Sequence, residues 1–188
     1  KLREAQLQID EQNRLYDQLT CDMKEQLDLL EGLLKSDRVT GRQRIAKICV
    51  LSAYMKRRSN LCLLAESEKK TSTKELELCI SESLESMRLC NLFCSFESHC
   101  SGKTAAGELI LLYDVVQQIF QQLLADAGAV MLWLRAENDS LFLKLQSDGR
   151  LCTEFPAMER WSAAGGSFFV SCGPDAAWLI LQKEGGKG

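Results

Sequence analysis

The chain has 188 residues, 46% of them hydrophobic and 26% charged, and a formal net charge of −3 at pH 7. This length accommodates one ordinary domain plus an appended helical element, and the two prolines leave room for long helices. The acidic balance provides no basic field for the phosphates of nucleic acid, so we expect no nucleic-acid partner.

The first part of the chain carries a long heptad pattern. Apolar residues recur at alternating spacings of three and four, with polar or charged residues between them. The positions of this stripe are Leu2, Ala5, Ile9, Gln12, Tyr16, Leu19, Met23, Gln26, Leu30 and Leu33, of which Gln12 and Gln26 are polar. The pattern predicts a coiled-coil-like helix that is interrupted at Ser36 to Gly41.

A second helix is expected from about Arg42 to Ala65, because Ile45, Ile48, Leu51 and Met55 recur at helical spacing. Two helices joined by a short turn form an antiparallel hairpin, and each has more apolar surface than one partner can cover. We therefore expect a homodimer through residues 1–65, in which two hairpins form a four-helix bundle.

The polar stretch from Glu66 to Thr73 is the expected domain boundary. Thr73 is a candidate cap for a helix that runs to about Arg88, and the chain then alternates between strand-like and helical patterns. The segments that follow are a strand over 92–97, a helix over 105–124 and strands over 130–136, 141–146, 167–171 and 178–181. This order predicts an α+β sandwich, in which helices cover one face of a single mixed sheet.

The order of these elements resembles the cytoplasmic transmitter of sensor histidine kinases. The segment from Thr20 to Leu27 is similar to the phosphoacceptor box of that family, and Ser147-Asp148-Gly149 follows a strand as the first glycine box does. The run from Ala164 to Phe168 resembles the family's Leu-Gly-Gly-Ser-Leu segment. The resemblance implies a dimerisation and phosphoacceptor domain in residues 1–66 and a reduced ATPase-like domain of the GHKL type in residues 67–188.

The phosphoacceptor box lacks its histidine. Cys21 stands where the family has the nucleophile, with Asp22 as its neighbour, and the sole histidine of the chain is His99 in the second domain. Phosphotransfer in this family uses a neutral imidazole, and an ordinary cysteine is mostly protonated near neutral pH. We therefore expect no catalytic residue at this position.

The nucleotide site implied by the resemblance is also altered. Asp114 and Gln118 stand on a helix where asparagines are usual, and Gln118 is a poor oxygen ligand for Mg²⁺. Asp148 and Gly149 match the start of the first glycine box, in which the aspartate contacts adenine. After Gly149 the chain is too short for the usual mobile lid. The cofactor is therefore expected to be absent or to be weakly bound Mg-ATP, and no metal site is expected.

These losses suggest a pseudokinase that relays a signal by conformation, with a response regulator or another sensor kinase as partner. The first alternative is an active histidine kinase or ATPase that uses the degenerate site. The second is a binding protein of the anti-sigma or sporulation-phosphotransferase type.

Three weaker signals have ordinary explanations. The run Ser101-Gly102-Lys103-Thr104 lacks the first glycine of a P-loop and reads as a surface turn. Cys90, Cys94, His99 and Cys100 lack the paired spacing of a zinc knuckle. The basic run from Lys56 to Arg58 reads as a solvated helix face, with a contact to the sister domain or to an acidic partner as the alternative.

The cellular location is expected to be the cytoplasm. Nine cysteines are spread over predicted helix and strand faces without a preceding signal peptide, and they read as small hydrophobic residues in a reducing compartment. The sequence contains no run that approaches the roughly 18 apolar residues needed to span a bilayer. The sequence begins inside a helical pattern without an initiator methionine, so we expect a longer chain, and membrane segments upstream stay an open alternative.

Overall fold

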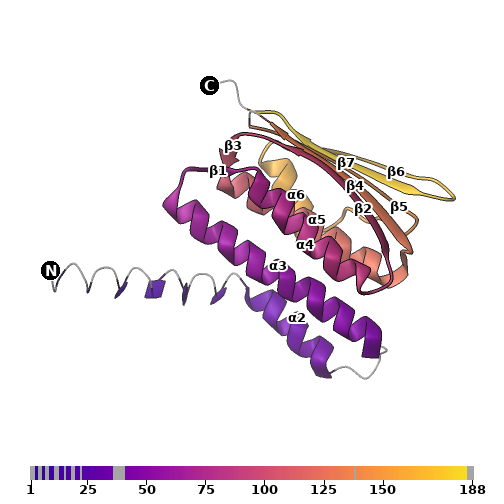
Figure 1. Cartoon of the computed structure of the whole chain (residues 1–188), viewed down its shortest axis with the longest axis horizontal. Helices are drawn as coiled ribbons and strands as arrows, with labels where there is room; N and C mark the ends of the chain where they lie inside the picture. Colours follow the sequence, from indigo (N-terminus) through magenta and orange to yellow (C-terminus); the bar gives the residue numbers. More distant parts are fainter. Residues whose placement is uncertain are drawn as a thin grey trace. The chain divides into compact units, whose positions relative to one another are not determined.

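The structure, a computed structural model, describes residues 24–35, 41–137 and 139–185, and earlier in the chain residues 3, 6, 9, 10, 13, 14, 16, 17, 20, 21 and 23. Contacts within the chain separate two compact units, Lys1–Arg38 and Val39–Gly188. Figure 1 shows the helices and strands with their labels.

The first unit is helical. The described residues from Arg3 to Cys21 are all in helical conformation, as the heptad pattern predicts, and helix α2 covers Lys24–Lys35. Helix α2 is amphipathic, and none of its residues, all of which are described, is buried. The predicted break before Gly41 lies outside the described residues. The antiparallel hairpin and the dimeric bundle stay predictions.

The second unit contains four helices and seven strands among its described residues. The helices are α3 (Gly41–Ser67), α4 (Lys74–Arg88), α5 (Ala106–Asp126) and α6 (Pro156–Ala163). Two short strands, β1 (Lys70–Ser72) and β3 (Lys103–Ala105), form a separate antiparallel pair. The main sheet consists of β2 (Phe93–Cys100), β4 (Ala129–Glu137), β5 (Ser140–Ser147), β6 (Ser167–Cys172) and β7 (Ala177–Lys183).

The main sheet is mixed, with the strand order β2-β4-β5-β7-β6. Strands β2 and β4 are parallel and are connected through α5, whereas the other neighbouring pairs are antiparallel. Helices α4, α5 and α6 lie against one face of this sheet, and α3 packs on α4 and α5 on the side away from the sheet (Figure 1). This arrangement confirms the predicted α+β fold with helices on a single face.

The core lies between the sheet and the helices. Because side chains alternate along a strand, every second residue of the central strands points toward the helices. These inward residues are buried, and they are Val130, Leu132, Leu134, Leu141, Leu143, Leu145, Leu179 and Leu181. The apolar stripe of α5 meets them with Leu109, Leu112, Val116, Phe120 and Leu123, as predicted.

Helix α6 was not predicted, because no element was assigned between the strands expected over 141–146 and 167–171. The helix has only eight residues, too few for a clear period, but Pro156 in its first turn is a typical start signal. At its end Gly165 has a φ of +84° and Gly166 N–H donates to Trp161 O, which forms a Schellman-type stop. Trp161 is a fully buried residue of this helix.

One further element was not predicted, and one prediction about local structure was wrong. The polar stretch before α4, expected to be a domain boundary, contains the short strand β1. Thr73 precedes α4 as predicted but makes no side-chain cap, because its hydroxyl donates to Gly102 O at 3.4 Å. Lys74 N–H donates instead to the hydroxyl of Ser72 at 3.3 Å.

Helix α3 belongs to the same compact unit as the sheet. The predicted division into a dimerisation domain ending at residue 66 and an ATPase-like domain beginning at residue 67 stays a prediction.

Among the described helices none has both the length and the apolar character needed to cross a bilayer. The nine cysteines are free thiols; Cys79 and Cys94 are buried, whereas Cys21, Cys152 and Cys172 are exposed.

Candidate functional site

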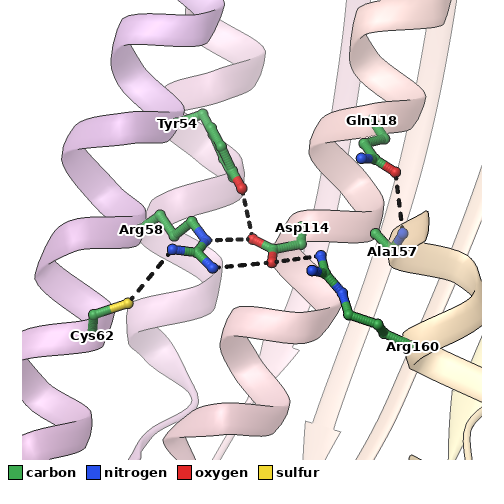
Figure 2. Close-up of polar contacts among 7 residues, drawn as sticks. All are labelled: Tyr54, Arg58, Cys62, Asp114, Gln118, Ala157 and Arg160. Atoms are coloured by element: carbon green, nitrogen blue, oxygen red, sulfur yellow. Dashed lines mark hydrogen bonds and ion pairs between the residues drawn. The ribbon is translucent and has the colours of Figure 1, made fainter. Parts of the chain in front are cut away.

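Asp114 lies on the face of α5 that meets α3 and α6, and only 5% of its surface is exposed. Its Oδ1 accepts hydrogen bonds from the Tyr54 hydroxyl at 2.7 Å and from Arg58 Nε at 2.9 Å. Its Oδ2 accepts from Arg58 Nη2 at 3.5 Å and from Arg160 Nη2 at 3.3 Å (Figure 2). These four bonds occupy the roughly four lone-pair positions of a carboxylate.

Tyr54 and Arg58, the two residues that α3 contributes to this cluster, both donate hydrogen bonds to Asp114. Burial alone would lower the pKa of Arg58, but the Asp114 charge and hydrogen bond raise that pKa by more, so the guanidinium stays charged. Burial, followed by the Asp114 charge, raises the pKa of Tyr54, so its hydroxyl stays protonated. The cluster therefore pairs the Asp114 carboxylate with the guanidinium groups of Arg58 and Arg160.

The rest of the basic run on α3 contacts α4. Lys56 Nζ lies 2.8 Å from Glu82 Oε1, and Arg57 Nε donates to Glu82 Oε2. Together with the contact of Arg58 to α5, these pairs connect α3 to both helices beneath it. The charged groups of Lys56, Arg57 and Arg58 are therefore all paired within this unit. They do not form the free solvated face expected from the sequence, and they are not open to another protein.

The glutamines of α5 bind the backbone of the segment that contains α6. Gln118 Oε1 accepts from Ala157 N–H at 3.4 Å, in the first turn of α6 (Figure 2). Gln122 Oε1 accepts from Cys152 N–H at 3.0 Å. Asp114, Gln118 and Gln122 are spaced four residues apart, so they lie along one side of the helix. This polar side of α5 thus anchors residues 152–160.

Asp148 lies at the end of β5 and contacts the backbone. Its Oδ1 accepts hydrogen bonds from Gly128 N–H and Ala129 N–H, both at 2.9 Å. Beside it, the Ser147 hydroxyl donates to Ala129 O and accepts from Gly149 N–H. The Ser-Asp-Gly run thus closes the turn between α5 and β4.

Gly149 approaches the end of α5 closely. A Cβ atom at this position would lie 2.8 Å from the Ala127 Cβ and 3.1 Å from the Leu123 Cδ2, so a larger residue would require the backbone to shift. The glycine that resembles a nucleotide motif is therefore also required by packing.

A pocket of about 440 Å³ lies between residues 148–151 and the turn that joins β6 to β7. Its lining residues are Asp148, Gly149, Arg150, Leu151, Cys172, Gly173, Pro174, Ala176 and Ala177. Asp148 and Gly149 are part of this lining, whereas Asp114 and Gln118 are not. Within the described residues, no three His, Cys, Asp or Glu side chains gather as a metal-binding group.

Comparison with solved structures identifies the fold. A histidine kinase domain from the Erythrobacter litoralis EL346 blue-light activated histidine kinase superposes with a TM-score of 0.54 at 12% identity, covering 86% of this chain and 94% of that one. The fold is that of a histidine kinase domain. The Acinetobacter baumannii histidine kinase AdeS has a TM-score of 0.45 at 13% identity, with coverage of 86% and 95%. A bacterial phosphotransferase has a TM-score of 0.49 at 10% identity, with coverage of 92% and 96%.

No protein-family model matches the sequence. A search of curated proteins found no match either. The likeness to histidine kinases is therefore a likeness of fold.

The phosphoacceptor-like position is described in part. Cys21 lies in helical conformation with an exposed side chain, whereas Asp22 lies outside the described residues. His99 is exposed on β2 of the histidine kinase-like unit. The roles predicted for Cys21, Asp114, Gln118, Asp148 and Gly149 stay predictions.

Proposed function

We propose that this chain is a signalling module with a histidine kinase-like fold that relays a signal by conformation and transfers no phosphate. The observation that carries the proposal is the environment of Asp114. A carboxylate that already accepts four hydrogen bonds from Tyr54, Arg58 and Arg160 has no lone pair left for Mg²⁺.

Two further features support the proposal. Gln118 and Gln122 are engaged by the backbone of residues 152–157, so the polar side of α5 is already occupied. The phosphoacceptor-like position holds the free, exposed Cys21, which lacks the imidazole nitrogen that carries the phosphate in histidine kinases.

Calorimetric titration of the full chain with Mg-ATP tests this proposal. We expect no binding in the low micromolar range, because Arg58 and Arg160 compete with the metal for the same carboxylate. Adenosine, which carries no phosphate, serves as the control for binding that does not involve the metal. Mg-ATP binding in the low micromolar range that depends on Mg²⁺ would contradict a closed site.

The pocket beside Asp148 favours a second candidate, an active kinase or ATPase that uses the degenerate site. The pocket has room for a small ligand, and Arg150 in its wall could face an anion. Incubation with γ-labelled ATP, alone and with a response regulator, tests this candidate. An Asp148→Asn variant keeps an oxygen for Gly128 N–H and Ala129 N–H, and Asp175→Asn in the nearby turn is its matched control.

The assembly is proposed to be a homodimer through residues 1–65, located in the cytoplasm. The amphipathic helix α2 supports the dimer, because none of its apolar side chains is buried. Sedimentation equilibrium of the full chain should give twice the monomer mass. A monomer at all concentrations would contradict the dimer while leaving the closed nucleotide site intact.

A further inference from the structure

The sheet of the second unit has one face without helices. Within the described residues 41–185, all helices lie on the opposite side of the sheet (Figure 1). Alternation along β4, β5 and β7 places the residues between the buried leucines on this outer face. Among them are Trp133, Lys144, Trp178 and Ile180, which are half-buried.

The outer-face residues form a largely apolar surface that also contains Lys144 and Gln146. In the sheet register Trp133 is opposite Lys144, Lys144 opposite Ile180, and Ile180 opposite Phe169 of the edge strand β6. The neighbouring row contains Met131 on β4 and Trp178 on β7, with Gln146 between them. Phe169 is 61% exposed at the edge of this surface. An apolar patch of this kind on a sheet marks an interaction site.

Lys144 is the single charged residue in the middle of this surface. Its ammonium group lies 4.5 Å from the centre of the Trp178 ring and 5.2 Å from that of Trp133, so two aromatic side chains hold it in place. Within the described residues no carboxylate pairs with it. At the edge of the surface, Arg135 is by contrast already paired with Glu137 at 3.1 Å.

We propose that the outer face, defined by Met131, Trp133, Lys144, Trp178, Ile180 and Phe169, docks a protein partner that presents a carboxylate surrounded by apolar side chains. The charge of Lys144 decides the class of partner. Tryptophan residues provide the large contact area typical of binding hot spots. A carboxylate that meets Lys144 gains interaction energy once the surrounding apolar contacts exclude water.

The same charge disfavours two other occupants. A second copy packed face to face would bring two Lys144 ammonium groups toward each other, and like charges in a desolvated interface are costly. An anionic membrane attracts clusters of basic residues, whereas this face has one unpaired lysine and the chain has a net charge of −3. The inference does not depend on the state of the nucleotide site, because Asp114 and the lining of the pocket beside Asp148 share no residue with this face.

The proposal is tested by selecting a displayed library of random linear peptides against the immobilised full chain. We expect enriched peptides to combine Asp or Glu with large apolar residues. Their affinity, measured by fluorescence anisotropy, should fall at least about tenfold in Lys144→Glu and in Phe169→Ser. Leu78→Ser is the matched control, since Leu78 is a 45% exposed apolar residue on helix α4, and its effect should stay within about twofold.

A charge reversal separates specific recognition from general stickiness. If a selected peptide binds through its carboxylate, changing that residue to lysine should abolish binding to the natural chain and restore binding to Lys144→Glu. Phe169→Ser changes an exposed side chain at the sheet edge, so loss of binding in this variant is not explained by unfolding, and a circular dichroism melt checks this.

Four results would overturn the proposal. These are failure to enrich any peptide family, enrichment of basic peptides, binding that is unchanged in Phe169→Ser and Lys144→Glu, and binding of phosphatidylserine vesicles that Phe169→Ser abolishes. A self-association that Phe169→Ser abolishes would assign the face to a second copy instead. A dimer through residues 1–65 would persist in this variant, so the two kinds of dimer are distinguishable.

Discussion

Replacing Arg58 by methionine should strongly destabilise the second unit. The Arg58 side chain is 13% exposed and that of Asp114 is 6% exposed, so the variant would leave a buried carboxylate without its main counter-charge. Removing one partner of a buried ion pair costs about 3–5 kcal/mol. Tyr54 and the largely exposed Arg160 still contact Asp114, so we expect the lower end of this range, about 3 kcal/mol.

Urea unfolding followed by tryptophan fluorescence measures this loss. With a dependence on urea of about 2 kcal/mol per molar, a loss of about 3 kcal/mol lowers the midpoint by roughly 1.5 M. The matched control is Lys103→Met, because Lys103 and Glu68 form a pair in which both side chains are more than half exposed. Exposed pairs contribute less than about 1 kcal/mol, so this control should shift the midpoint little.

A second variant tests the cause of the effect. Arg58→Met combined with Asp114→Leu removes the uncompensated carboxylate together with its partner, and apolar replacement of a buried pair is often nearly neutral. The double variant should therefore be more stable than Arg58→Met alone. The reasoning fails if Arg58→Met shifts the midpoint no more than Lys103→Met, or if the double variant is the less stable of the two.

Two further predictions concern Glu82 and Gly166. Burial tends to raise the pKa of Glu82, but Lys56 and Arg57 lower it below the ordinary value of 4.5. A lowered pKa in the folded state stabilises the fold above the unfolded value, and this contribution is lost as the pH falls through the folded value. The urea midpoint should thus fall as the pH is lowered from 6 to 3, a range set roughly by ordinary carboxylate pKa values. It should fall less in Glu82→Gln. An equal fall of the midpoint in both proteins would contradict this role of Glu82. In Gly166→Ala, the new Cβ would overlap the Trp161 ring, and we expect a loss of about 1–3 kcal/mol in a thermal melt. Gly107→Ala, with nothing within 4 Å of the new Cβ, should be neutral or stabilising, and similar melts for both variants would argue against the overlap.

The sequence was most informative where a single period controls an element. Helices α4 and α5 and the strands of the sheet follow apolar patterns, and their predicted bounds differ from the observed ones by only a few residues. These elements bury one face against one core, so local pattern and tertiary structure agree. The mixed sheet followed from their order along the chain.

The polar contacts of the site could not be predicted from local pattern. Asp114 was identified as a candidate through the resemblance to histidine kinases, but its partners Tyr54 and Arg58 lie more than 50 residues earlier in the sequence. The basic run of α3 was interpreted as a solvated face, because no residue near it in the sequence indicates that Glu82 of α4 lies opposite. Side chains that pair across helices depend on how those helices pack.

The eight-residue helix α6 shows a second limit. Its one clear signal, Pro156, indicates where a helix can begin but not whether one forms. Its position is stabilised by the side chains of Gln118 and Gln122. These glutamines lie 39 residues before Ala157 and 30 residues before Cys152, whose N–H groups they bind. A short helix that depends on contacts of this kind has little periodicity of its own.

The way in which Gln122 holds Cys152 has a consequence for sequence variation. The glutamine recognises a backbone N–H group, and the Cys152 side chain is exposed, so almost any residue at position 152 preserves the hydrogen bond. Proline is the exception, because it has no N–H to donate. We therefore expect the residue at position 152 to tolerate substitution, whereas replacement of Gln122 would remove the hydrogen bond that anchors the loop before α6.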